Sequence, residues 1–166
     1  MKRVMWLCVL VGLVAVPLSA QMPKYGVTVK ADEKTDFSKF KTYTWEHGWQ
    51  AYDKGVHQAI LAAVDRELAA AGLTKRESGP SDLLVTYASL RRIDVDLNAK
   101  PTAGEGTRPQ VDVGTLVVLL LDPGTRKEFF RARLDQPIEL DDAAKVKAVV
   151  DTAVKEMFAK YPTKRK

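Results

Sequence analysis

Hydrophobic and polar residues alternate in several segments of this 166-residue chain, and each such segment predicts a β-strand. The alternation is clear over residues 25–30, β-branched and aromatic residues fill 42–45, and odd positions are mostly apolar over 83–97. Residues 111–121 end in a leucine and valine run that is apolar on both faces, which predicts a strand at the centre of the sheet. Residues 128–134 are expected to pair back on it as a hairpin.

Two further segments carry apolar residues at helical spacing. The first has an apolar residue at every fourth position and ends at Gly72, while the second opens at Asp141-Asp142 and stops at Pro162. The apolar stripes are Val56, Ile60, Val64 and Leu68 in the first segment, and Val146, Val149, Val150, Ala153, Met157 and Tyr161 in the second.

The order of expected elements is β-β-α-β-β-β-α. The sequence Asp122-Pro-Gly-Thr125 predicts a tight turn in which Gly124 supplies a positive φ. Tight turns join antiparallel neighbours, and each helix has one apolar face to bury. The sequence therefore predicts an α+β fold: a single antiparallel sheet of about five strands, with two helices packed on one face.

The first twenty residues have the order of a secretory signal peptide. Two basic residues precede an almost wholly apolar stretch, residues 4–16, and small residues follow Pro17. This order predicts cleavage between Ala20 and Gln21. The mature chain is therefore expected to be periplasmic or secreted.

Two alternatives to a cleaved signal peptide are a membrane anchor and a lipoprotein. A helix over residues 4–20 would span only about 25 Å, less than the ~30 Å hydrocarbon core of a bilayer. The sole cysteine is Cys8, inside the apolar stretch, so no cysteine follows the predicted cleavage site to accept a lipid. The mature chain is expected to contain no disulfide and no transmembrane segment.

Residues 21–166 have the size of a single α+β domain. Proline and glycine in residues 98–110 predict a mobile loop, and residues 163–166 form a basic tail. After removal of residues 1–20 the chain has 24 basic and 21 acidic residues, and the excess comes from the C-terminal end. Nucleic acid is therefore not an expected partner.

No motif for catalysis, a metal or a cofactor stands out. The four serines of the mature chain lie outside nucleophile motifs, and no helix start follows Gly104-Glu-Gly106. His47 and His57 are ten residues apart and lack the spacing of metal ligands. Asp94 and Asp96 share one face of the long strand, where paired carboxylates could bind calcium or transfer protons, but solubility of the strand is the favoured interpretation. No catalytic residue, metal ligand or cofactor is assigned.

Four aromatic residues fall within ten positions. Tyr43 and Trp45 share a strand face and are expected in the core, whereas Trp49 and Tyr52 lie beyond Gly48 in a loop. Two interpretations of the loop pair are open: they cover the end of the core, which is favoured, or they form an exposed partner surface.

The segment Asp36-Phe-Ser-Lys-Phe-Lys-Thr-Tyr-Thr-Trp45 resembles the opening motif of a bacterial family known as domain of unknown function 4136. The resemblance continues in order through Ile60, Val64, Leu68 and Gly72-Leu73, then Asp82-Leu-Leu-Val85, Gly114-Thr-Leu-Val117, Leu121-Asp122, Arg131 and Met157-Phe-Ala-Lys-Tyr-Pro162. It implies an exported envelope protein, often a lipoprotein, with a compact α+β domain and no established activity. The chain departs from the family in lacking a lipidation cysteine, and in carrying Phe130-Arg131-Ala132 where members often have Trp-Arg-Gly.

These observations predict a periplasmic or cell-envelope protein of unknown activity that acts as a non-catalytic binding or accessory module. Its partner would be an unknown envelope protein or a small ligand. One alternative is an enzyme whose site gathers the scattered polar residues Arg91, Asp94, Asp96 and His57. Another is envelope interaction through the 98–110 loop and the basic tail.

Overall fold

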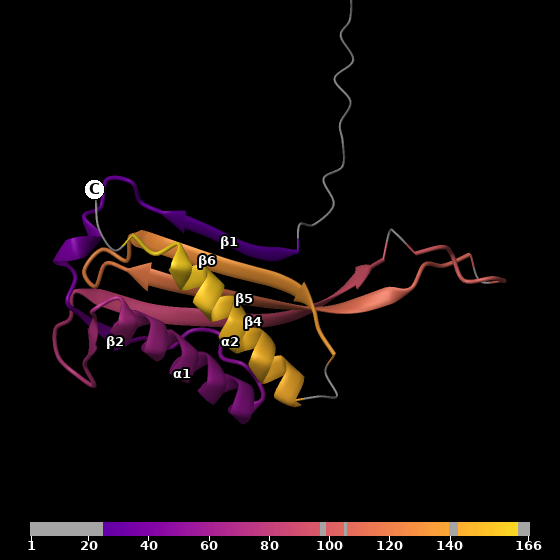
Figure 1. The fold of residues 1–166 in the computed structure, drawn as a ribbon, viewed down its shortest axis with the longest axis horizontal. Helices are drawn as coiled ribbons and strands as arrows, with labels where there is room; N and C mark the ends of the chain where they lie inside the picture. Colours follow the sequence, from indigo (N-terminus) through magenta and orange to yellow (C-terminus); the bar gives the residue numbers. More distant parts are fainter. Residues whose placement is uncertain (1–24, 97–98, 105, 140–142, 163–166) are drawn as a thin grey trace, which may run out of the picture.

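The protein folds into one sheet with two helices beside it (Figure 1), in a computed structural model that describes residues 25–96, 99–104, 106–139 and 143–162. The strands are β1 (Gly26–Ala31), β2 (Thr42–Trp45), β3 (Thr74–Lys75), β4 (Leu83–Val95), β5 (Gln110–Leu121) and β6 (Glu128–Pro137). The helices are α1 (Lys54–Ala70), α2 (Ala143–Ala159) and the short 3-10 helix η1 (Phe37–Lys39). Residues 1–20, the predicted cleavage site at Ala20 and Gln21, and the 163–166 tail lie outside the described residues.

The sheet is mixed, with the strand order β1-β6-β5-β4-β2-β3. Strands β1, β6, β5 and β4 pair antiparallel, whereas β2 pairs parallel with both β4 and β3. The prediction of a single antiparallel sheet of about five strands is therefore wrong. The cause is α1, which follows β2 and returns the chain so that the next strands run in the direction of β2. The sixth strand, β3, has two residues and is too short to show a hydrophobic period.

Both helices cover the same face of the sheet, and the core lies between the two layers (Figure 1). Residues in the later part of each predicted helical stripe are fully buried there, as Val64, Leu68 and Met157 show. The sheet contributes the alternate residues of its central strands: Leu83, Val85 and Tyr87; Leu116, Val118 and Leu120; Phe130, Ala132 and Leu134. Strand β5 lies inside the sheet between β4 and β6, which confirms the position expected from its apolar run.

The turn between β5 and β6 differs from the sequence expectation in one detail. The positive φ lies at Arg126 (61°) and not at Gly124. The Asp122 carboxylate accepts hydrogen bonds from the backbone nitrogens of Gly124 and Thr125, at 3.0 and 2.6 Å. This side chain closes the first part of the turn, so the left-handed residue is needed only where the chain re-enters β6.

Strands β4 and β5 continue beyond the rest of the sheet as a two-stranded arm, residues 93–112 (Figure 1). The pairing of β5 with β6 ends at Val113 and Pro137, so the arm strands Ile93–Val95 and Gln110–Asp112 pair with each other. Of the predicted 98–110 loop, residues 99–104 and 106–109 lie outside the strands, Gln110 already belongs to β5, and residues 98 and 105 lie outside the described residues.

Candidate functional site

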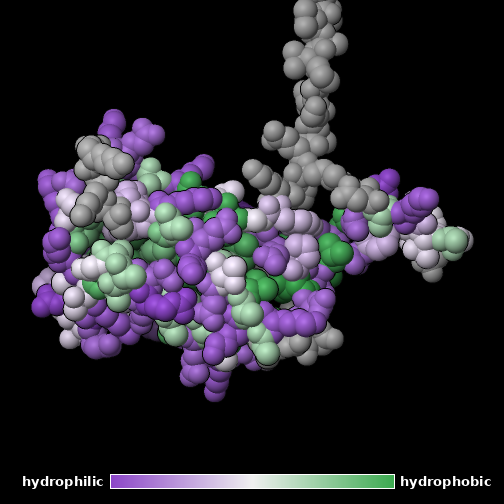
Figure 2. All heavy atoms as spheres, in the orientation of Figure 1, coloured by the Kyte–Doolittle hydropathy of each residue, from purple (hydrophilic) through white to green (hydrophobic). Residues whose placement is uncertain are grey.

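An apolar groove of about 470 Å³ opens on the helix side of the sheet, at the end where the helices begin and the arm leaves the body. Figure 2 shows green apolar side chains at this end of the helical layer, with purple hydrophilic ones around them. The apolar lining comes from α1 (Val56, Ile60), α2 (Val146, Val149, Val150), β5 (Leu116), β6 (Leu134) and Ile138. A volume of this size falls within the range of about 300–1,000 Å³ typical of small-molecule sites.

The groove lies where the two helices begin, beyond the fully buried part of the core. Val56 and Val146 begin the two apolar helical stripes, and both are only partly buried, as is Val149, whereas the remaining residues of each stripe are buried. The floor includes Gly114, where a Cβ atom would lie 3.1 Å from two side-chain carbons of Ile138. A glycine at this position leaves room for Ile138 to lie across the strand and extend the apolar floor.

The two charged side chains in the lining, Asp53 and Arg91, both make hydrogen bonds within the protein. The Asp53 carboxylate caps α1 by accepting a hydrogen bond from the Val56 backbone nitrogen at 2.8 Å. Arg91 donates from Nε and Nη2 to one oxygen of Asp112, at 2.9 and 2.8 Å. Both charged groups are thus engaged within the protein, and the rest of the lining is mostly apolar, which suits an uncharged, largely apolar occupant.

The segment between β2 and α1 forms one wall of the groove. Its backbone passes very close to the backbone of β4. A Cβ atom on Gly48 would lie 2.2 Å from the Tyr87 carbonyl oxygen, so no other residue fits here without a shift. The next residue, Trp49, forms a bridge to Ala88, and its carbonyl accepts a hydrogen bond from the Ser89 nitrogen at 2.8 Å. This approach places residues 50–53 along the groove.

The buried hydroxyl of Tyr87 also contacts this wall and holds it in place. It accepts a hydrogen bond from the Ala51 backbone nitrogen at 3.1 Å and lies 2.5 Å from Nδ1 of His57. Burial raises the pKa of Tyr87, so the hydroxyl keeps its proton and can donate it to the His57 ring. The loop, α1 and β4 are thus joined at one side chain.

Trp49 and Tyr52, the predicted partner surface, are both on the outside of the molecule. The Trp49 side chain is 70% exposed and Tyr52 is fully exposed. Neither covers the end of the core, so the interpretation that we favoured from the sequence does not hold. Tyr52 lies at the groove, whereas Trp49 lies beside β4. A partner at this surface stays a prediction.

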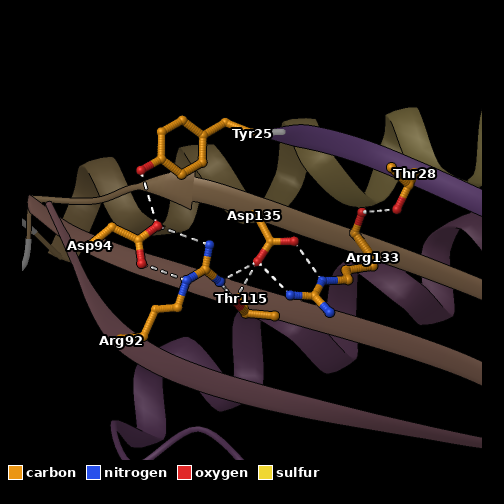
Figure 3. A network of polar contacts seen from close by, with 7 residues as sticks. All are labelled: Tyr25, Thr28, Arg92, Asp94, Thr115, Arg133 and Asp135. Carbon is orange, nitrogen blue, oxygen red and sulfur yellow. Dashed lines mark hydrogen bonds and ion pairs between the residues drawn. The ribbon is translucent and has the colours of Figure 1, made fainter. Parts of the chain in front are cut away.

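A cluster of charged residues lies on the opposite face of the sheet, away from the helices (Figure 3). Arg92 binds Asp94 through two hydrogen bonds of 2.8 and 3.1 Å and reaches Asp135 at 2.5 Å. Thr115 and Arg133 also donate to Asp135, and the Tyr25 hydroxyl donates to Asp94. The polar cluster therefore links the start of β1 with β4, β5 and β6.

The electrostatics of the polar cluster keep both carboxyls ionised. Burial acts to raise the pKa of Asp135, but the hydrogen bonds from Arg133, Arg92 and Thr115 outweigh it and hold that pKa well below its usual range. The hydrogen bond from Arg92 likewise lowers the pKa of Asp94. A carboxyl held ionised in this way is a poor general acid at neutral pH. The polar cluster therefore links neighbouring strands of the sheet.

The four residues of the enzyme alternative are not brought together. Arg91 lines the groove and Asp94 belongs to the polar cluster on the other face. Asp96 follows the end of β4. His57 lines a separate polar hollow of about 320 Å³, together with His47. Within the described residues, no three potential metal ligands among His, Cys, Asp and Glu cluster, and no helix is long and apolar enough to cross a membrane.

The sequence contained a signal for the polar cluster but none for the groove. Arg92-Ile-Asp94 and Arg133-Leu-Asp135 repeat the same Arg-x-Asp spacing, which places both charges on one face of a strand. For the groove, the partly buried first residues of each helical stripe are of the same apolar type as the buried ones. Only the spatial position of the helix ends distinguishes them.

Comparisons with known proteins identify a family and a fold. The sequence profile of the family described as "Domain of unknown function (DUF4136)" matches residues 27–163. None of the curated proteins compared with the chain matches its sequence.

Two solved structures resemble the fold. A PDZ domain protein from Parabacteroides distasonis ATCC 8503 has a TM-score of 0.57 and 14% identity over 86% of this chain, which spans 36% of that protein. A PelC dodecamer from Paraburkholderia phytofirmans has a TM-score of 0.52 and 9% identity, with 84% of this chain and 99% of that one covered. At such low identities the likeness concerns the fold alone.

Proposed function

We propose that this chain, which belongs to the DUF4136 family, is an exported envelope protein that binds a small, largely apolar ligand in its groove without catalysing a reaction. The observation that carries the proposal is the groove itself. It combines an aliphatic lining from both helices and the sheet with two charged residues that are already hydrogen-bonded within the protein. Concave, mostly apolar sites with few polar groups are typical of ligand binding.

The proposed location rests on the first twenty residues, whose order is that of a signal peptide with cleavage between Ala20 and Gln21. Its test is the mass of the protein recovered from the periplasm and the medium. An N-terminus at Gln21 in the exported fraction supports the proposal, whereas protein that keeps residues 1–20 contradicts it.

Ligand binding is tested with N-phenylnaphthylamine, an uncharged probe that fluoresces in apolar surroundings. We expect saturable binding to the chain from residue 21 onward. Val146→Glu places a charge on the partly buried groove wall. The buried charge should weaken probe binding at least tenfold, which corresponds to about 1.4 kcal/mol or more.

Ala148→Glu is the matched control, because Ala148 is on the same helix, exposed and outside the groove lining. It should bind the probe as the unmodified chain does. Equal loss in both variants would show a general effect of added charge and would count against the groove. Absence of probe binding to a folded, unmodified chain would remove the proposal.

A further inference from the structure

We propose that two copies of this chain pair antiparallel along the free edge of β4 and form one continuous sheet. This edge comprises residues 90–95, and we call it the β4 edge. The proposal concerns assembly and does not depend on what the groove binds.

The β4 edge has unpaired backbone groups on one side. Strand β5 pairs with β4 from Leu84 to Val95, but on the other side β2 reaches only Val85, and Trp49 bridges Ala88. The last backbone bond on that side is donated by Ser89, and none follows along β4 within the described residues. Backbone direction alternates along a strand, so the N–H and C=O groups of Arg91, Ile93 and Val95 point outward.

Apolar side chains stand exposed along the same edge. Leu90, Ile93 and Val95 are 44%, 61% and 49% exposed, and the exposed Trp49 and Tyr52 lie near its start. Within the described residues, the two outer strands of the sheet lack this combination, because β3 has two residues and the valines of β1 are partly buried. An exposed apolar strand with open hydrogen-bonding groups is a template for strand pairing.

The β4 edge is complementary to itself in one register. With Ile93 opposite Ile93 of the second copy, Arg91 of each copy lies opposite Val95 of the other. The outward backbone groups of these residues then face each other across the pair. On the opposite face of the sheet, Arg92 then stands opposite Asp94 of the second copy. Opposite charges across strands stabilise pairing, whereas a centre at Arg92 or Asp94 would place like charges together.

The charge pattern favours a second copy over a foreign peptide. The Arg92 side chain is one-third exposed, so it can meet another carboxylate while it keeps its own partners. Leu90 and Arg91 also line the groove, so the added strand would border the mouth of the groove.

Disulfide trapping tests the register. The chain from residue 21 onward has no cysteine, so Ile93→Cys introduces a single thiol. In the proposed pair the two Cα atoms at position 93 lie about 5.5 Å apart, within the range of disulfides. We expect a disulfide-linked dimer under mild oxidation. Val95→Cys is the control, since two copies of position 95 would be about 13 Å apart and should stay unlinked.

Sedimentation equilibrium tests the association itself. The unmodified chain should be a reversible dimer, and Ile93→Lys should weaken association at least tenfold by opposing two like charges at the centre of the pair. Ile93→Thr, which keeps a β-branched and uncharged residue, should retain most of the association. A monomer at all concentrations, or equal linking of both cysteine variants, would overturn the proposal. Strand addition by a peptide to a monomeric chain would do so as well.

Discussion

At the scale of single residues, Gly48 sets the position of one wall of the groove. It needs no unusual φ, but its backbone passes so close to β4 that a side chain would overlap the Tyr87 carbonyl oxygen and the Thr86 hydroxyl. The carbonyl belongs to a central strand and cannot move away. The wall that carries Tyr52 and Asp53 therefore depends on the absence of one methyl group.

Gly48→Ala is expected to lower the free energy of unfolding by about 2 kcal/mol, as overpacking in a well-packed region does. It should also weaken binding of the apolar probe, because the wall at residues 50–53 would shift. Urea unfolding and probe titration measure the two effects.

Gly124→Ala is the matched control, since its added Cβ would lie 3.5 Å from the Asp122 carboxylate, an ordinary contact. Its unfolding and probe binding should stay close to those of the unmodified chain. Equal stability of the two variants would show that the close approach at Gly48 carries no cost.

At the scale of elements, the polar cluster ties strands that are distant in sequence. Asp135 of β6 accepts from Arg92 of β4 and Thr115 of β5, and it is 9% exposed. Because the carboxylate is buried, removal of its charge leaves two guanidinium groups with fewer partners in a partly desolvated place.

Asp135→Asn should therefore destabilise the fold by about 2–3 kcal/mol. Asp112→Asn makes the same change in the more exposed Arg91–Asp112 pair, and we expect it to cost less than about 1 kcal/mol. Urea unfolding of the three proteins gives both differences. If Asp135→Asn lowered the free energy of unfolding less than Asp112→Asn, the polar cluster would not be what holds these strands together.

The elements also show how far the sequence could predict the fold. Strand β5 and both helices were predictable, because β5 is a long run that is apolar on both faces and the helices have long apolar periods. The parallel pairing of β2 was harder to see, although a helix between two strands is the usual parallel connection. The two-residue β3 and the groove at the helix starts arise from how distant segments pack together, and no local sequence pattern encodes them.

At the scale of the whole molecule, several carboxyls have pKa values below their ordinary value of 3.8 in the folded state. Hydrogen bonds from Lys127 lower the pKa of Asp32 to about 2, and backbone N–H groups lower those of Asp82 and Asp122. Asp94 and Asp135 are lowered by their arginine partners, against the effect of burial in Asp135. The folded chain therefore binds fewer protons than the unfolded chain over the pH range in which the carboxyls of the unfolded chain titrate.

It follows that the free energy of unfolding should fall as the pH drops through the ordinary range of aspartate, while the carboxyls of the unfolded chain become protonated first. We expect little change from pH 7 to 5 and a progressive loss below about 4.5. Urea unfolding across this range measures the slope, and Asp135→Asn should flatten it. A stability that rises on acidification would contradict the lowered pKa values.

The pairing of β1 with β6 joins the first strand of the sheet to the last, from Gly26 with Asp135 to Ala31 with Phe130. Synthesis proceeds from the N-terminus, so β1 emerges about a hundred residues before its partner. Such long-range pairing is slow, because a long loop must close before any contact compensates for it. The sheet therefore closes only when the chain is nearly complete. For the export that we propose, this topology would delay folding until translocation is almost finished.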